Sequence, residues 1–170
     1  MALRSNSTNS GKAKPWQFMT KFVIHVDGDI YMIRWRLVQT PYFAVYLHKF
    51  LRGDADPYVH DHPWNFISFV LRGGYGEIVR DNFTHKLRHR NVRFVNVKRR
   101  DDAHYVHTLH RTPTWTLVFR GRQRRTWGFW VPLPSQGDDA FIRNEPTSIP
   151  GEVPRQTWIE FEDFNKNGVR

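Results

Sequence analysis

Short runs of β-branched and aromatic residues, separated by turn residues, constrain the fold of this chain more than any other feature. Such runs recur from Trp16 to Pro132, and none shows the apolar period of an amphipathic helix. Aromatic residues make up 15% of the chain, and these residue types favour strands over helices. We therefore predict an all-β fold, either a barrel or a sandwich.

Turn residues and composition divide the chain into three parts. The triplet Asp27-Gly28-Asp29 lies between two β-rich runs and predicts a hairpin, and Gly73-Gly74 predicts a bend at a barrel corner. The predicted parts are a flexible basic arm (1–15), a β-barrel (16–134) and a turn-rich C-terminal extension that packs on the barrel (135–170).

Composition excludes several classes of protein. The chain has no Cys, which excludes disulfides, thiolate metal sites and Cys nucleophiles. No apolar run is long enough for a membrane span, and we see no signal peptide, so we expect a cytoplasmic protein without a membrane partner. The formal net charge of +10 favours anionic ligands without naming one.

The sharpest local feature is the sequence His60-Asp61-His62, followed by Pro63. On an extended segment, residues i and i+2 face the same way, about 6.6 Å apart. Two imidazoles so placed can converge on one metal ion, with each nitrogen about 2.1 Å from it. The alternative, two hydrogen-bonded histidines in a surface loop, stays open on spacing alone.

A second group of histidines lies in His104-Tyr105-Val106-His107, directly after a turn. His104 and His107 are three positions apart, so on a regular strand they face opposite ways and only one can point into a barrel. We favour His104 as the inward residue, because it follows the turn. His107 is then expected behind a ligand, in the second coordination shell, or at the surface.

These two stretches resemble the motifs of the cupin superfamily. HDHPWNFISFVLRGGYGE resembles the first cupin motif, and DDAHYVHTL is similar to the second without its usual Pro and Gly. The wider region, about residues 30–130, also resembles a group of small cupin-like proteins of phages and bacteria, which implies a bacterial cell or a phage-infected host. The resemblance implies a single jelly-roll β-barrel with a metal inside, and no particular substrate.

Residue by residue, the resemblance implies His60, His62 and His104 as metal ligands. The family's usual glutamate is missing, because Phe66 and Ile67 occupy the positions where it would fall. Two alternatives remain open. Either Glu77 reaches back as a fourth ligand, or the site is three-His, as in the cupin-type thiol dioxygenases.

We favour the three-His site and keep Glu77 as a candidate ligand that could equally be an exposed carboxylate paired with an arginine. Neutral imidazoles accept Fe, Zn, Ni or Cu. We expect Fe(II), because an open three-nitrogen face can bind oxygen and substrate together.

Several residues are candidates for contact with an anionic small-molecule substrate. Trp64, beside the histidine pair, could stack on it, although a core or rim aromatic is the simpler interpretation. Arg72, or Arg34 or Arg36, could capture an anion. His48 could line the barrel, although such a histidine is more often a hydrogen-bonded structural residue.

Two basic patches support a rival interpretation. Residues 86–100 interleave seven Lys or Arg residues with Val92, Phe94, Val95 and Val97, and the arginines of 120–125 stand directly before the aromatic stretch 127–130. Basic residues beside exposed aromatic residues suit single-stranded nucleic acid. The alternative, which we favour, is that they are solvent-facing sides of strands.

The sequence thus predicts a metal-binding protein, with two functions in view. The first is a non-haem, dioxygenase-like enzyme. The second is a non-catalytic module whose Arg-rich face binds nucleic acid or an acidic protein, with a structural or vestigial metal. Exposed strand edges favour a homodimer in either case.

Overall fold

The computed structural model describes residues 16–26, 28–54, 58–132 and 156–160. The expected arm at 1–15 lies outside the described residues, and so does the expected C-terminal extension except for the strand at its middle. The described part of the chain is built from strands and turns, and the expected all-β fold is confirmed. It contains no helix long and apolar enough to cross a bilayer.

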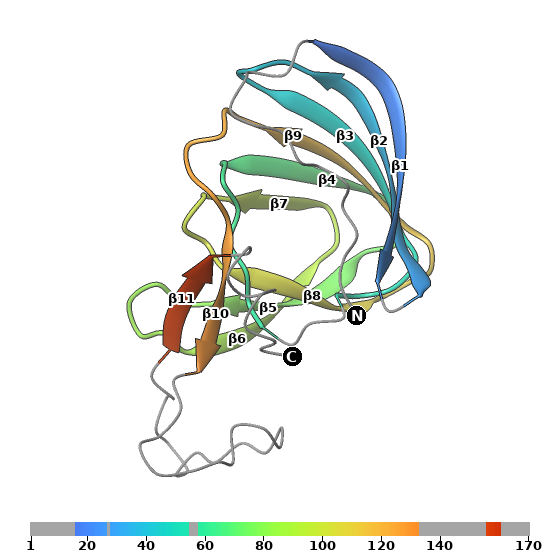
Figure 1. The fold of residues 1–170 in the computed structure, drawn as a ribbon. Helices are drawn as coiled ribbons and strands as arrows, with labels where there is room; N and C mark the ends of the chain where they lie inside the picture. The colour runs from blue at the N-terminus through green and yellow to red at the C-terminus, as the bar shows by residue number, and fades with distance from the viewer. Residues whose placement is uncertain (1–15, 27, 55–57, 133–155, 161–170) are drawn as a thin grey trace.

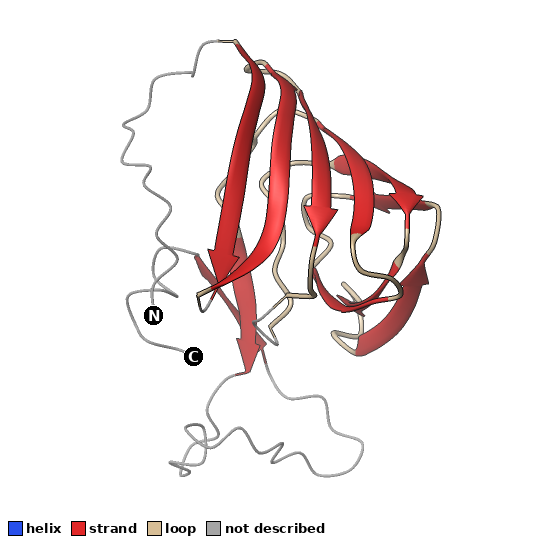
Figure 2. Ribbon diagram, turned by 90° about the vertical axis from the view of Figure 1, so that its right-hand side faces the viewer, coloured by secondary structure: helices blue, strands red, loops and turns tan. Residues whose placement is uncertain are grey.

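The strands form two sheets that face each other, with an added strand pair at one side (Figures 1 and 2). A six-stranded sheet has the order β1-β2-β3-β9-β4-β7, a three-stranded sheet has the order β6-β5-β8, and β10 pairs with β11. All of these pairings are antiparallel. The strands are β1 (Gln17–Val26), β2 (Asp29–Gln39), β3 (Ala44–Phe50), β4 (Phe66–Arg72), β5 (Tyr75–Arg80), β6 (Leu87–Val92), β7 (Val95–Lys98), β8 (His104–Leu109), β9 (Thr114–Arg120), β10 (Gly128–Pro132) and β11 (Gln156–Glu160).

The predicted hairpin joins β1 to β2. Val26 pairs with Asp29, and Gly28 between them has a φ of 90°, in the region that glycine enters without a steric penalty. The alternation expected of a half-buried strand is clearest in β3, where buried and half-buried residues take turns along the whole strand. The last two buried residues of β3 are His48 and Phe50, so the inward face of this strand supplies both polar and apolar groups to the interior.

The predicted bend at Gly73-Gly74 carries the chain from the six-stranded sheet into the three-stranded sheet. Both glycines have positive φ, 94° and 122°. A Cβ on Gly73 would lie 2.4 Å from Thr114 Oγ1, and one on Gly74 would lie 2.9 Å from His110 Nδ1. The two strands can therefore meet at this corner only because neither residue has a side chain.

The interior between the sheets is unusually polar. Small apolar clusters exist, such as Ala44, Tyr46 and Val118. The largest fully buried side chains, however, are all polar: Glu77, Asn96, Thr114, Thr116 and Asp61. Because buried polar groups are stable only when they are hydrogen-bonded, this interior indicates a site rather than a plain hydrophobic core.

We predict that Gly73→Ala lowers the free energy of unfolding by about 2 kcal/mol, from backbone strain and the clash with Thr114. Gly28→Ala is the matched control, because Gly28 has a similar φ but no heavy atom within 4 Å of its would-be Cβ. It should cost only about 1 kcal/mol. Urea denaturation of both variants measures the difference, and equal losses would show that the close approach at Gly73 contributes nothing.

Candidate metal centre and pocket

Two of the predicted histidines lie on an extended segment held between β8 and β10. The His60 amide donates to the His104 carbonyl at 3.0 Å, and the His104 amide donates back to the His60 carbonyl at 2.9 Å. One residue further on, the Asp61 amide donates to the Gly128 carbonyl at 3.1 Å. Because the segment is extended, His60 and His62 lie on one side of it, towards the interior.

The structure brings the three predicted histidines together. The nitrogens of His60, His62 and His104 that could hold an ion all lie within 4.8 Å of one another. His62 Nε2 lies 3.0 Å from His104 Nε2. Two nitrogens each about 2.1 Å from one ion, at a right angle, would be about 3.0 Å apart. The donor set therefore fits a transition-metal ion in both chemistry and spacing.

Burial favours the neutral form of the His60 and His62 rings. It lowers the pKa of His60 to about 4, against the opposing attraction of Asp54. It also lowers the pKa of His62 well below its ordinary value, and the neighbouring His104 and His60 rings add to the effect. A neutral imidazole keeps a lone pair for a cation, so the state that burial favours is the state a metal ligand needs.

Glu77 lies behind His104 rather than beside the other two rings. Its Oε2 lies 2.7 Å from His104 Nδ1. A carboxylate only accepts hydrogen bonds, so the proton of His104 is on Nδ1 and the lone pair of Nε2 faces the cluster. Glu77 thus orients a candidate ligand and does not take the expected place of a fourth one.

The Glu77 carboxylate is fully buried, so the alternative of an exposed rim carboxylate is wrong. It accepts hydrogen bonds from Arg90 Nε at 2.6 Å and from Asn96 Nδ2 at 3.1 Å, and it lies 3.1 Å from Lys98 Nζ. Burial alone would raise the pKa of Glu77, but the hydrogen bond from His104 and the charges of Lys98 and Arg90 hold it below its ordinary value. The carboxylate is therefore ionised and almost fully satisfied.

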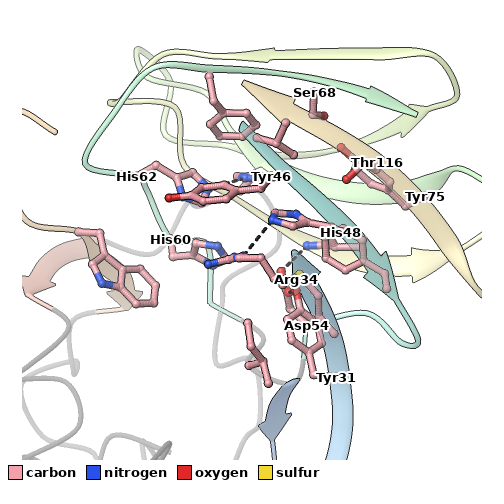
Figure 3. A pocket seen from close by; sticks show the side chains of 18 of the residues that line it. Tyr31, Arg34, Tyr46, His48, Asp54, His60, His62, Ser68, Tyr75 and Thr116 are labelled. Atoms are coloured by element: carbon pink, nitrogen blue, oxygen red, sulfur yellow. Dashed lines mark hydrogen bonds between the residues drawn. The ribbon is translucent and has the colours of Figure 1, made fainter. Parts of the chain in front are cut away.

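The histidine cluster opens into a pocket of about 510 Å³ between the two sheets (Figure 3). Its lining is mostly apolar and aromatic. Two of the predicted substrate-binding residues, Arg34 and His48, project into it from β2 and β3. Arg34 Nε donates to His48 Nε2 at 2.9 Å, and the Arg34 guanidinium lies over the Tyr46 ring, 5.3 Å from its centroid.

No carboxylate forms an ion pair with Arg34 among the described residues, and the charged groups that face it include Arg36 and Arg120. Burial lowers the pKa of Arg34, and burial with the Arg34 charge lowers the pKa of His48 well below its ordinary value. A neutral His48 ring accepts the Nε–H bond and holds the guanidinium in place. The pocket thus contains a cation, Arg34, and one carboxylate, Asp54, which is hydrogen-bonded to other groups.

Of the other residues predicted for the site, one lines the pocket and two lie at the surface. Trp64 lines the pocket and lies under the Arg120 guanidinium, 4.5 Å from ring centroid to Cζ. Arg72 and His107 are exposed and do not line the pocket, so the structure does not bring them to the site. His107 contacts the rings of Tyr105 and His89 on the outer side of β8, as its spacing from His104 predicts.

Sequence reasoning missed a buried pair in the pocket wall, Tyr31 and Asp54. The Tyr31 hydroxyl donates to Asp54 Oδ1, and the Val106 amide donates to Asp54 Oδ2 at 2.6 Å. Burial raises the pKa of Tyr31 well above its ordinary value, and Asp54 adds to the effect. Asp54 belongs to the Gly- and Asp-rich stretch after β3, which carries the signal of a turn and none of a site. The order of polar and apolar residues along β2 does not mark Tyr31 as a site residue either.

No family model matches this chain, and no curated protein matches it. Solved structures similar to it include Fe(II)-HppE with the alternative substrate (S)-1-HPP, at 16% identity over 61% of this chain and 55% of that one, with a TM-score of 0.48. Others are KdgF from Halomonas sp. (19%, covering 65% and 90%, TM-score 0.42) and an RmlC-like cupin from Shewanella frigidimarina (15%, covering 62% and 86%, TM-score 0.42).

The matched part of this chain spans about half the length of HppE. Cupin-fold proteins are thus among the matches, the fold type that the sequence motifs resemble. At these identities the similarity concerns the fold alone.

We predict that Glu77→Gln weakens zinc or iron(II) binding about 10- to 100-fold, because an amide holds the His104 tautomer less firmly. It should also lower the free energy of unfolding by about 3 kcal/mol, since Lys98 and Arg90 lose their buried counter-ion. Isothermal titration with the metal and urea denaturation measure the two effects. Asp29→Asn, at an exposed ion pair with Arg52, is the control and should change neither. Unchanged metal affinity in Glu77→Gln would contradict the orienting role.

Proposed function

We propose that this protein is a cupin-type metalloenzyme of the non-haem oxygenase class that acts on a small anionic molecule. The observation that carries the proposal is the convergence of three imidazoles at the wall of a pocket between the two sheets. The cupin motifs of the sequence and the all-β fold support the same assignment.

His60, His62 and His104 are the residues that would hold the ion. Three nitrogen ligands leave one or more coordination positions for water or substrate, because such ions take four to six ligands, and the pocket adjoins the cluster. Iron(II) is our choice among the metals that imidazole accepts, since bound iron(II) supplies the redox chemistry that dioxygen requires. Zinc, nickel and copper are distinguished by the metal analysis below.

Arg34 is the residue that we assign to the anionic group of the substrate. Its Nε is already bound to His48, so its terminal nitrogens can bind a carboxylate or a phosphonate side-on. The Tyr46 ring beneath the guanidinium limits its movement. A substrate held there would lie with its anionic end on Arg34 and its other end towards the histidines.

The remaining wall excludes water and selects by shape. Phe66, Trp127 and Phe129 surround the histidines with apolar surface. Trp64 adds a flat ring close to the histidine segment. In such surroundings the attraction between Arg34 and an anion is stronger than in water.

Metal analysis tests the ligand set. Protein purified without a His tag should contain about one iron or other transition-metal ion per chain, and His62→Ala and His104→Ala should lose it because three ligands are needed. His107→Ala is the matched control, since His107 lies on the same strand and faces outward. Elemental analysis by mass spectrometry provides the measurement.

Fewer than about one metal ion per ten wild-type chains, not restored by added iron(II), would contradict the proposed site. Two results together would favour the alternative of a structural metal. The loss of the metal in His62→Ala would lower only the melting temperature, and the wild-type protein would consume no oxygen with any small anion tried.

Substrate class is tested by oxygen consumption. An oxygen electrode, with iron(II)-loaded protein, screens small carboxylates and phosphonates. We expect Arg34→Met to lower kcat/KM on the active compound about 100-fold, because a charged hydrogen bond inside the pocket is lost. Lys49→Met removes a positive charge from the outer side of β3, where Lys49 lies over Trp115, and should leave kcat/KM unchanged. Equal effects of the two variants would contradict the role of Arg34.

A further inference from the structure

Residues from three distant parts of the sequence meet at one end of the six-stranded sheet. Strand β4 lies between β7 and β9 and runs antiparallel to both, so its first residue, Phe66, pairs with Lys98 and with Arg120 (Figure 1). The segments just before β4, after β7 and after β9 therefore end up together. They line a second pocket of about 390 Å³, formed by Asn65, Arg99, Arg100, Asp101, Gly121, Arg122 and Arg124.

This pocket takes its arginines from both basic patches of the sequence. In 86–100, Arg90 and Lys98 are bound to Glu77, and Arg88 pairs with Asp81 at 3.3 Å. Three basic residues of that patch are therefore paired with carboxylates, and one of them, Lys98, is buried. In 120–125, Arg120 points inward to the Tyr46 hydroxyl.

Four further arginines of these stretches, Arg99, Arg100, Arg122 and Arg124, line the second pocket. Arg100 contacts Asp101 at 3.6 Å, and Arg125, beside the pocket, contacts both Asp101 and Asp61. Arg99, Arg122 and Arg124 form no ion pair within the described part of the chain. Four guanidinium groups and one carboxylate thus leave a strong excess of positive charge in one concave site.

The backbone of this pocket is fixed, so its shape does not depend on a ligand. The Arg100 amide donates to Asn65 Oδ1 at 2.8 Å, and the Gly121 amide donates to the Asn65 carbonyl at 2.9 Å. The Arg124 amide donates to the Pro63 carbonyl at 2.8 Å. These bonds hold the two arginine-bearing segments against the Pro63–Asn65 segment, while the exposed guanidinium groups remain available.

We propose that this second pocket, separate from the histidine site, binds phosphate groups. Planar guanidinium forks match the oxygens of a phosphate, and several of them around one cavity suit a ligand with two or more negative charges. Asp101 does not oppose this, because Arg100 and Arg125 already contact it. The phosphates can belong to a small phosphorylated molecule or to the backbone of a single-stranded nucleic acid.

The test uses the full chain in a phosphate-free buffer, with pyrophosphate as the first probe in isothermal titration. We expect binding that the double variant Arg122→Gln/Arg124→Gln weakens about tenfold or more, since two charge-assisted contacts are lost. The control double variant Arg93→Gln/Arg111→Gln removes the same charge from exposed positions outside the pocket and should bind as the wild type does. Arg99→Gln, in the segment after β7, is an independent test of the pocket and should also weaken pyrophosphate binding.

A fluorescein-labelled single-stranded oligothymidine, followed by anisotropy, separates the two sources of phosphate. Binding that pyrophosphate displaces, and that the same pocket variants lose, assigns the site to nucleic-acid backbone. Pyrophosphate binding without oligonucleotide binding assigns it to a small phosphorylated molecule. No pyrophosphate binding, or an equal loss in the pocket and control variants, overturns the proposal. Thermal unfolding of each variant verifies that the exposed substitutions leave the fold intact.

Discussion

One fully buried carboxylate, that of Glu77, connects the two sheets and the histidine cluster. It lies on β5 in the three-stranded sheet, and it accepts hydrogen bonds from Asn96 and contacts Lys98, both on β7 in the six-stranded sheet. On its other side it fixes the proton position of His104. A buried charge is tolerated only when it is paired and hydrogen-bonded on all sides. The contacts that make Glu77 stable therefore also set the distance between the sheets at the site and the orientation of one ring in it.

The histidines and Arg34 give the pocket two chemically different regions. The histidine region is neutral because burial disfavours the protonated rings, and it can accept a cation. The region around Arg34 and His48 carries a positive charge that forms no ion pair within the described part of the chain, and it can accept an anion. Apolar and aromatic side chains line the rest of the pocket. A molecule with one anionic end and one end able to reach a metal would be complementary to this arrangement.

The sequence predicted those features of the fold that depend on a few neighbouring residues. The hairpin at Gly28, the bend at Gly73-Gly74 and the inward direction of His104 all follow from backbone conformations that a few neighbouring residues set. The role of Glu77 could not be predicted in this way, because its partners come from β6, β7 and β8 and meet only in the folded chain. For the same reason the sequence could not show which basic residues of the two patches meet in space. Charge along the sequence does not show that Lys98 is buried or that Arg99 and Arg122 share a pocket.

The bridge between His60 and His104 has a consequence for how the protein matures. These residues are far apart in sequence, and the strands between them must first pair within two different sheets. Contacts of such long range form slowly, since much of the chain must be ordered before they are made. The three rings come together only where the His60 segment pairs with β8. An ion bound by all three of them would therefore find its complete ligand set in the folded chain and not in a local stretch of the unfolded one.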